Sequence, residues 1–424
     1  MRVKRVKGNA LYAQSGGVTA VINATAAGLI EAAREKGISV YAGKNGILGV
    51  LTEELIDTTK ETAKNIQHLR YTPGGAFGSC RYRLARPDKQ NQQEYKRLFE
   101  VFSAHNIRYF FYNGGGDSHD TVHKISQMSK ALNYPLTCIG IPKTIDNDLP
   151  LTDNCPGFGS TAKYIATSVR EIGYDLKSMA ASSTKIFVFE VMGRHAGWIA
   201  AASGLAKQLP DDPPHLILFP EVAFNEDQLL AKTTEAVKKW GYCVIVASEG
   251  IKNKQGIFLS DIGCLDAFGH TQLGGVAPVI ARTIKKNLGY KYHWAVADYL
   301  QRSARHIASK TDLTQAYTLG KAAITFALQG KTDIMTTIIR KSDRPYRWSV
   351  GWVELVDVAN LEKKLPLNFI AADGFHITDA CRDYLSPLIK GEEFPPFNNG
   401  LPKYVRLKNI LVPKKLASFE VNCQ

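Results

Sequence analysis

The sequence predicts an α/β protein with a largely parallel sheet, and three observations support this fold class. Short runs rich in β-branched or aromatic residues alternate with helical patterns along most of the chain. The 424 residues are typical of one to three domains and are enough to bury a sizeable core. With 45% hydrophobic and 22% charged residues, the composition is that of an ordinary globular protein.

The expected strands are short apolar runs, each followed by a turn signal. They lie at Ala10–Gln14, Tyr109–Tyr112, Leu136–Ile141, Ile186–Val191, His215–Phe219 and Cys243–Ala247. The expected helices have apolar residues every three or four positions, and they lie at Ala20–Lys36, Gln92–His105, Ser118–Leu132, Ser160–Ile172, Ala196–Leu205, Glu226–Trp240 and Thr314–Gly330. The pattern is less regular after about residue 250, where Asn287–Trp294 interrupts it. Pro210–Pro214 is expected to form a loop, a candidate crossing between domains, and the basic tail from Phe394 to wrap the surface.

Composition and cysteine spacing exclude several classes of protein. No apolar run reaches the roughly 18 residues of a membrane span. The basic start, Met1–Gly8, is followed by an apolar stretch too short for a signal peptide. The seven cysteines stand at least 17 positions apart with no CxxC pair, a pattern typical of reduced thiols. We therefore expect a cytoplasmic protein that makes no membrane contact.

The formal net charge of +14 raises the possibility of a nucleic-acid partner. Residues 1–10 contribute +4 of this charge and residues 401–424 another +4, so the body is only mildly basic. A mildly basic body suits small anionic substrates as well as it suits DNA. Because the excess charge sits at the two ends, we expect no nucleic-acid partner.

Polar or glycine-rich segments directly follow five of the expected strands. These segments are Ser15–Gly17, Asn113–Ser118, Pro142–Asp148, Met192–His195 and Ser248–Gly250. In an open parallel sheet, ligands bind at the carboxyl ends of the strands. The five loops therefore predict a single site at one edge of the sheet.

The Gly16–Gly17 and Gly114–Gly116 turns each open an expected helix. Glycines let the backbone approach an anion, and the helix N-terminus directs N–H groups toward it. Either turn alone could equally be a tight connection, but the two together favour phosphate binding. Neither fits a Walker A loop or the dinucleotide fingerprint in a strand–helix context.

Three acids lie close to these turns. Asp146 and Asp148 are two positions apart, so in an extended loop both can face one cavity, and Asp117 comes from the neighbouring loop. Carboxylates beside phosphate loops suit Mg²⁺, and one of them can instead accept a proton from an attacking hydroxyl. The alternative is that the Asp-Asn-Asp segment only shapes the chain through Asx turns.

Three cations also lie in or near these segments. Lys143 could neutralise charge on a phosphoryl group in transfer, and the alternative is a solvated surface lysine. Arg194 and Arg302 could bind phosphate esters in bidentate fashion, and the alternative for a single arginine is a salt bridge.

Together these motifs resemble the phosphofructokinase family, and specifically its pyrophosphate-dependent branch. The resemblance runs from about residue 8 to about residue 330, and PKTIDND is its most specific motif. It rests on SGG with Asn23, GSCR at Gly78–Arg81, NGGGDS, PKTIDND, MGR, SEG, YLQR and Ala308–Asp312.

The resemblance implies two Rossmann-like parallel-sheet domains, the phosphofructokinase fold, with the active site in a cleft between them. We expect an N-terminal α/β domain over residues 1–180 with the phosphoryl-donor and catalytic loops. A second α/β domain over 181–330 would bind the sugar phosphate, and an extension over 331–424 would pack on the body.

The resemblance also implies the reaction: reversible phosphoryl transfer from pyrophosphate to the 1-hydroxyl of D-fructose 6-phosphate, giving fructose 1,6-bisphosphate and phosphate in glycolysis or gluconeogenesis. Asp146 would be the proton acceptor, and the other catalytic residues would be Lys143, Asp117 and Arg194. The diphosphate side would comprise Gly16, Gly17, Arg81, Gly115, Gly116 and Lys143. The sugar-phosphate side would comprise Thr144, Asp146, Lys185, Met192, Gly193, Arg194, Glu249, Tyr299, Leu300, Gln301 and Arg302.

Two positions indicate the phosphoryl donor. ATP-using relatives carry GGDGS and PGTIDND, whereas this chain has Gly-Gly-Gly-Asp-Ser at 114–118 and Lys143 in the second motif. A carboxylate at Asp117 occupies and repels the space of a nucleotide α-phosphate, while Lys143 supplies positive charge. The alternatives are an ATP-dependent 6-phosphofructokinase, a non-catalytic phosphate-metabolite-binding subunit on the same fold, and a nucleotide-dependent oxidoreductase, which the missing fingerprint disfavours.

The chain departs from the family pattern at several positions. Gly116 stands where the usual magnesium ligand is an acid, so Mg²⁺ would fall to Asp117 or Asp148. Val18 replaces a common Asp, and Lys185 replaces an arginine that often reaches the neighbouring subunit's sugar phosphate. The family implies a homo-oligomer, with a dimer favoured and a tetramer possible. The absence of an effector signature beyond about residue 330 suits a non-allosteric enzyme.

Overall fold

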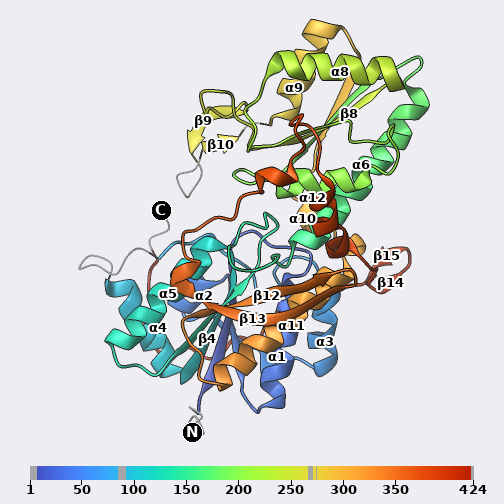
Figure 1. Cartoon of the computed structure of the whole chain (residues 1–424). Helices are drawn as coiled ribbons and strands as arrows, with labels where there is room; N and C mark the ends of the chain where they lie inside the picture. Colours follow the sequence, from blue (N-terminus) through green and yellow to red (C-terminus); the bar gives the residue numbers. More distant parts are fainter. Residues whose placement is uncertain (1–6, 85–91, 266–270, 274, 422–424) are drawn as a thin grey trace.

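The computed structural model describes residues 7–84, 92–265, 271–273 and 275–421, and it contains two main sheets (Figure 1). The first sheet has seven strands in the order β13-β12-β5-β4-β1-β2-β3, and the second has four in the order β11-β6-β8-β7. Apart from the edge strands β3 and β13, which run antiparallel to β2 and β12, all pairings in these two sheets are parallel. The expected α/β class with largely parallel sheets is confirmed.

The central strands of the first sheet, β1, β4 and β5, are buried on both faces, which explains why they are almost continuously apolar. Its strands are β1 (Asn9–Gln14), β2 (Val40–Gly43), β3 (Leu55–Asp57), β4 (Ile107–Gly114), β5 (Thr137–Pro142), β12 (Ile334–Asp343) and β13 (Tyr346–Glu354). In β1, Ala10 and Tyr12 join the core under α1 (Ile22–Glu35) and α11 (Lys310–Leu328). Leu11 and Ala13 join the opposite core with α4 (Gln92–Ala104) and α5 (Gly116–Ala131).

The second sheet repeats this arrangement on a smaller scale. Its strands are β6 (Ile186–Val191), β7 (Leu216–Leu218), β8 (Cys243–Ser248) and β11 (Tyr292–Val296). One face packs on α6 (Phe158–Met179) and α7 (Trp198–Ser203), and the other on α8 (Glu226–Trp240) and α9 (Ala277–Leu288). The 210–214 loop connects α7 to β7 within this half, so it is not a crossing between domains. Residues 287–294, expected as an interruption, contain the end of α9 and the start of β11.

The chain beyond residue 330 contributes to the first sheet before it crosses the molecule. Strands β12 and β13, which lie in the expected extension, form one edge of that sheet, with β12 parallel to β5. Residues 355–366 then run toward α12 (Asp379–Leu385), which packs against the second half (Figure 1). The short pair β14 (Phe397–Asn398) and β15 (Leu401–Pro402) follows.

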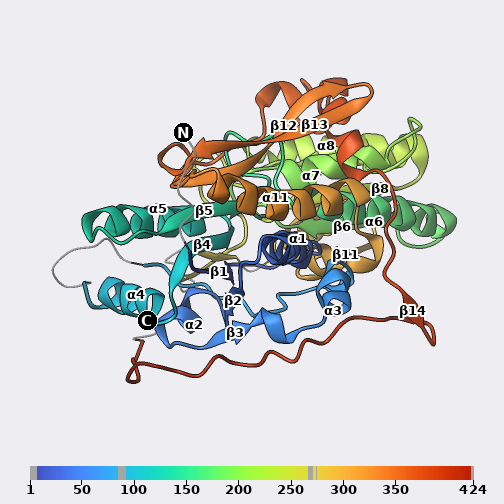
Figure 2. The ribbon, with the colours of Figure 1, turned by 90° about the horizontal axis from the view of Figure 1, so that it is seen from below.

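The tail wraps the surface, as expected from its sequence, and it covers the opposite edge of the first sheet (Figure 2). The N–H of Asp57 donates to the carbonyl of Ile410 at 2.8 Å, and that of Val412 donates to Leu55 at 2.7 Å. Two buried acids bind the tail backbone as well: Glu61 accepts from Lys408, and Glu53 accepts from Lys415.

Two further expectations can be compared with the described residues. None of the helices described combines the length and the apolar character that a membrane span requires. Within the same residues, five cysteines are buried free thiols, at positions 80, 138, 155, 243 and 381. The side chain of Cys264 and all of Cys423 lie outside what the structure describes.

Candidate active site

The loops after β1, β4 and β5 meet around the side chain of Lys143. These three strands are neighbours in the first sheet, so their carboxyl ends lie together. The N–H of Lys143 donates to the carbonyl of Gly114 at 3.0 Å, and its Nζ donates to the carbonyl of Gly17 at 2.5 Å. Lys143 is only 4% exposed, so it is not a solvated surface lysine.

Three cations gather at the turn of Gly16 and Gly17. A Cβ on Gly16, where φ is +69°, would lie 3.5 Å from Nζ of Lys143. A Cβ on Gly17 would lie 2.6 Å from Nη1 of Arg302 and 3.8 Å from Nη2 of Arg81. Burial, with the charges of Arg302 and Arg81, lowers the pKa of Lys143 to about 8 against the opposing effect of Asp146. Such a cluster is suited to a multiply charged anion.

Arg302 lies on the side of the first sheet's loops in this structure. Its guanidinium stacks on the ring of Tyr299, with Cζ 3.7 Å from the ring centroid, while Nη1 reaches Gly17. Arg302 follows β11, a strand of the second sheet. It therefore joins the two halves of the site, although the sequence resemblance implies a contact with the sugar phosphate.

Charged groups from both halves of the site act on the carboxyl group of Asp146. Burial, with the charges of Asp148 and Glu249, raises its pKa to about 7 against the opposing effect of Lys143. The N–H of Asp146 donates to Oγ1 of Thr144 at 3.0 Å, which fixes the turn. A carboxylate whose pKa lies near neutrality is matched to a role as a general base. The first sheet supplies Asp146, while Glu249 follows β8 in the second.

The second half of the site is held mainly by backbone contacts. Gly193, with φ of +127°, donates its N–H to Oε1 of Glu249 at 3.3 Å. Met192 donates its N–H to Oε1 of Gln301 at 3.2 Å. Burial raises the pKa of Glu249, and Arg194 opposes this shift. Met192, Gly193, Arg194, Glu249 and Gln301 thus lie together in the structure.

Other predicted residues lie at the margin of this arrangement. Arg81, Tyr299 and Leu300 are exposed, with Tyr299 and Leu300 at 59% and 63% of their surface. Lys185 lies at the amino end of β6, and its Nζ donates to the carbonyl of Ala180 at 2.7 Å. The loops of the site follow the carboxyl end of β6, so Lys185 is not brought to them within one chain.

The predicted metal ligands can be tested against the structure. Gly116 begins α5, and Asp117 is exposed in its first turn. No group of three His, Cys, Asp or Glu side chains suited to a metal occurs among the described residues. Oδ1 of Asp148, however, is buried without a hydrogen-bond partner there, and burial raises the pKa of this acid. Since Mg²⁺ in such sites uses one or two carboxylates together with substrate phosphates and water, the residues fit a metal carried by diphosphate.

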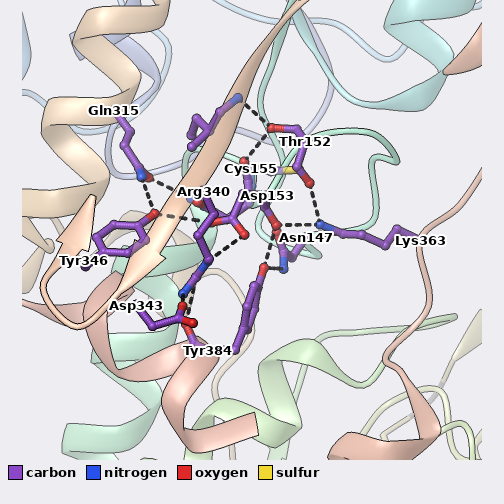
Figure 3. Close-up of polar contacts among 12 residues, drawn as sticks. Asn147, Thr152, Asp153, Cys155, Gln315, Arg340, Asp343, Tyr346, Lys363 and Tyr384 are labelled. Carbon is purple, nitrogen blue, oxygen red and sulfur yellow. Dashed lines mark hydrogen bonds and ion pairs between the residues drawn. The ribbon is translucent and has the colours of Figure 1, made fainter. Parts of the chain in front are cut away.

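Sequence reasoning missed the residues that hold these loops from behind. His119 is buried, and its Nδ1 donates to the carbonyl of Gly115 at 2.7 Å; burial lowers its pKa to about 4, so the ring is neutral. Lys363, Arg340 and Tyr384 contact the loop that carries Asp146 (Figure 3). Hydrophobic periodicity gives no signal for such contacts, because they join segments far apart in the chain.

Comparison with known proteins identifies the family. The family model described as "Phosphofructokinase" matches residues 9–327. The pyrophosphate–fructose 6-phosphate 1-phosphotransferases of Methylococcus capsulatus and Xanthomonas campestris are 61% and 59% identical, each over 97% of this chain and 99% of its own length. The crystal structure of a pyrophosphate-dependent phosphofructokinase from Marinobacter aquaeolei, 57% identical, covers 98% of this chain and 100% of its own with a TM-score of 0.90. This chain belongs to the phosphofructokinase family.

Proposed function

We propose that the protein transfers a phosphoryl group reversibly from pyrophosphate to the 1-hydroxyl of D-fructose 6-phosphate. The observation that carries this proposal is the place of Asp146 between the two halves of the site. The charges of Lys143, in the cation cluster, and of Glu249, on the opposite half, both act on its carboxyl group. The names of the relatives, which match nearly the full chain, support pyrophosphate over ATP as the donor.

In this reaction Asp146 accepts the proton of the 1-hydroxyl as the oxygen attacks the nearer phosphorus. The new O–P bond forms on the sugar, the P–O–P bond breaks, and phosphate leaves with the electron pair. Lys143, Arg81 and Arg302 stabilise the negative charge that spreads over the phosphoryl oxygens. The backbone N–H groups of Gly17, Gly115 and Gly116 would face the diphosphate, while Gly16, whose N–H donates to the carbonyl of Cys80 at 2.8 Å, would let the backbone approach it closely.

The sugar phosphate is bound by the opposite half of the site. Arg194 pairs with its phosphate, and Glu249 fixes the loop of Arg194 through the N–H of Gly193. The remaining contacts come from Thr144, Met192, Tyr299, Leu300, Gln301 and the stacked Arg302. Binding in one orientation places the 1-hydroxyl at Asp146, and such positioning accounts for much of the catalysis of phosphoryl transfer.

Mg²⁺ is the proposed cofactor, and Asp148 with Asp117 would hold it near Gly116. When bound, the ion neutralises charge on the diphosphate. Asp117 has a second proposed role, since its charge at the start of α5 repels a nucleotide α-phosphate.

We further propose a cytoplasmic, non-allosteric homodimer that acts in glycolysis or gluconeogenesis, with a tetramer as the alternative. Lys185 supports the oligomer, because it lies at the end of β6 remote from its own chain's site loops. In that position it would serve the sugar phosphate of the neighbouring subunit.

An assay with separate donors tests the proposed function. The purified protein is given fructose 6-phosphate and Mg²⁺ with either pyrophosphate or ATP, and fructose 1,6-bisphosphate is measured by a coupled aldolase reaction. Turnover with pyrophosphate and little with ATP is expected; turnover with ATP alone would overturn the proposal. Asp117→Gly combined with Lys143→Gly is expected to admit ATP and weaken pyrophosphate use, and sedoheptulose 7-phosphate serves as a competing acceptor.

A further inference from the structure

The chain beyond the family-matched residues contacts the back of the loop that carries Asp146 and Asp148. This loop connects β5 to α6, and residues 147–153 form its turn. Figure 3 shows side chains from β12, from residues 355–366 and from α12 converging on this turn. None of these side chains belongs to the catalytic or binding residues described above.

Lys363 binds the turn at both of its ends. Its backbone N–H donates to the carbonyl of Asp148 at 2.6 Å. Its Nζ donates to the carbonyls of Thr152 and Asp153, at 3.1 Å and 2.9 Å. Trp198 of α7 donates its indole N–H to the carbonyl of Lys363 at 3.1 Å, so Lys363 also connects the loop to the second half of the molecule.

Tyr384 fixes the residue that lies between the two acids. Asn147 has a left-handed backbone with φ of +54°, and its Oδ1 accepts the N–H of Cys155 at 3.0 Å. The other end of this amide, Nδ2, donates to the hydroxyl of Tyr384 at 3.1 Å. That hydroxyl donates in turn to the carbonyl of Asp153 at 2.6 Å. Both ends of the Asn147 amide are therefore held, and Asp146 and Asp148 are attached on either side.

Arg340 of β12 anchors the same turn to the first sheet. Its Nε pairs with Oδ1 of Asp153 at 2.9 Å, and its Nη2 donates to the carbonyl of Tyr384 at 3.0 Å. The Arg340 guanidinium also lies over the rings of Tyr346 and Tyr384. Tyr384 is thus bound by Arg340 of the first sheet, and Lys363 is bound by Trp198 of α7. The positions of both residues that contact the turn are therefore well determined.

We propose that Lys363 and Tyr384 are positioning residues for the reaction: they hold the 147–153 turn from behind, so that the Asp146 carboxylate stays in line with the sugar hydroxyl. This inference rests on the proposed function. A displacement of about 1 Å in a reacting group can cost about a hundredfold in rate, although substrate contacts elsewhere are retained. The predicted signature is a loss in kcat with little change in KM.

The test compares Lys363→Met with Lys364→Met, which removes the exposed neighbouring lysine. Lys363→Met is expected to lower kcat tenfold to a hundredfold and to change KM for either substrate less than about threefold. Lys363→Arg retains donors for the two carbonyls and is expected to restore most of kcat. Titration calorimetry with fructose 6-phosphate is the control for folding. A variant that binds the sugar phosphate with the same stoichiometry as the wild type is folded.

Tyr384→Phe provides an independent variant that keeps the ring and removes only the hydroxyl. It is expected to lower kcat about three- to tenfold. Tyr174→Phe, which changes an exposed side chain on α6, is expected to leave kcat unchanged. If Lys363→Met does not fold, Lys363→Arg and Tyr384→Phe decide the question. Folded variants of both residues with wild-type kcat would overturn the proposal.

A double-variant cycle asks whether Lys363 acts through Asp146. In an Asp146→Ser background, Lys363→Met is expected to change the residual kcat less than twofold, because there is no carboxylate left to position. An equal loss in both backgrounds would overturn the proposal. Each ratio of variant kcat to wild-type kcat is measured with the phosphoryl donor that the wild type uses. If the wild type does not use pyrophosphate, the proposed function fails. If the kcat ratios are close to one, this inference fails.

Discussion

The two halves of the site hold their charged groups in different ways. In the first half, Lys143 is buried and bonded to the turn it would serve, and Asp146 shares its surroundings with a second acid. In the second half, Arg194 is half-buried, and backbone N–H groups bind Glu249 and Gln301. Fixing charges in a buried region before substrate arrives favours catalysis, whereas the second arrangement favours recognition. The comparison predicts that variants of the first half mainly lose kcat and variants of the second half mainly raise KM.

Asp146→Ser should have the largest effect. Loss of a general base costs about 10²- to 10⁴-fold, so kcat should fall by that factor while KM changes modestly. Steady-state kinetics in both directions of the reaction would measure it. Asp211→Ser, in the loop between α7 and β7, is the matched control. If Asp146→Ser kept nearly the wild-type kcat, Asp146 would not be the base. The two halves of the site would then not differ in their effect on kcat.

Lys143→Met should follow. Removing one charge-stabilising group from a buried site costs about 10²- to 10³-fold in kcat. The loss should appear with pyrophosphate in the forward direction and with phosphate in the reverse, as measured by initial rates. Lys341→Met, on β12, is a control lysine outside the site. A change confined to KM would assign Lys143 to binding rather than to chemistry.

Arg302 and Arg194 sharpen the comparison, because one arginine reaches Gly17 and the other lies beside Glu249. Arg302→Met should mainly lower kcat, about tenfold or more, while Arg194→Met should mainly raise KM for fructose 6-phosphate. Product-inhibition kinetics would separate the two effects, with Arg170→Met on α6 as control. If Arg302→Met and Arg194→Met both raised only KM for fructose 6-phosphate, and to the same extent, Arg302 would belong to the sugar-phosphate half of the site.

The pH dependence of kcat/KM should show a fall of about tenfold per unit on either side of a maximum. Asp146 must be ionised to accept a proton, and its pKa is raised to about 7, so kcat/KM should fall below that pH. Lys143 must be charged, and its pKa is lowered to about 8, so kcat/KM should fall above that pH. Rates measured from pH 5 to 10 should give a narrow maximum between these values. Arg302→Met should move the basic limb upward, since a repelling charge is removed from Lys143.

Much of the site could be predicted because the chemistry lies in contiguous motifs. The strand-to-loop transitions at Gln14–Gly17, Gly114–Asp117 and Pro142–Asp148 combine an apolar run with polar residues, and the parallel sheet brings the strand ends together. Short strands such as β2 and β3 were missed, because runs of three or four residues give too little periodicity.

What could not be predicted depends on residues distant in sequence. Arg302 reaches Gly17 only because β11 delivers it across from the second sheet, and no local pattern encodes that approach. The contact of Lys363 with Asp148 joins two segments whose sequences are individually ordinary. The place of β12 next to β5 likewise follows from tertiary pairing and not from the order of elements along the chain.

The placement of β12 has a consequence for how the chain is made. Strand β5 ends at Pro142, and its partner β12 begins at Ile334, with every strand of the second sheet encoded between them. During synthesis on the ribosome, the apolar edge of β5 that β12 will cover therefore stays unpaired while the second sheet is translated. Such edges attract other chains, so we expect newly synthesised protein to depend on chaperones until β12 emerges. A truncation before residue 334 should aggregate, even though it retains every proposed catalytic residue.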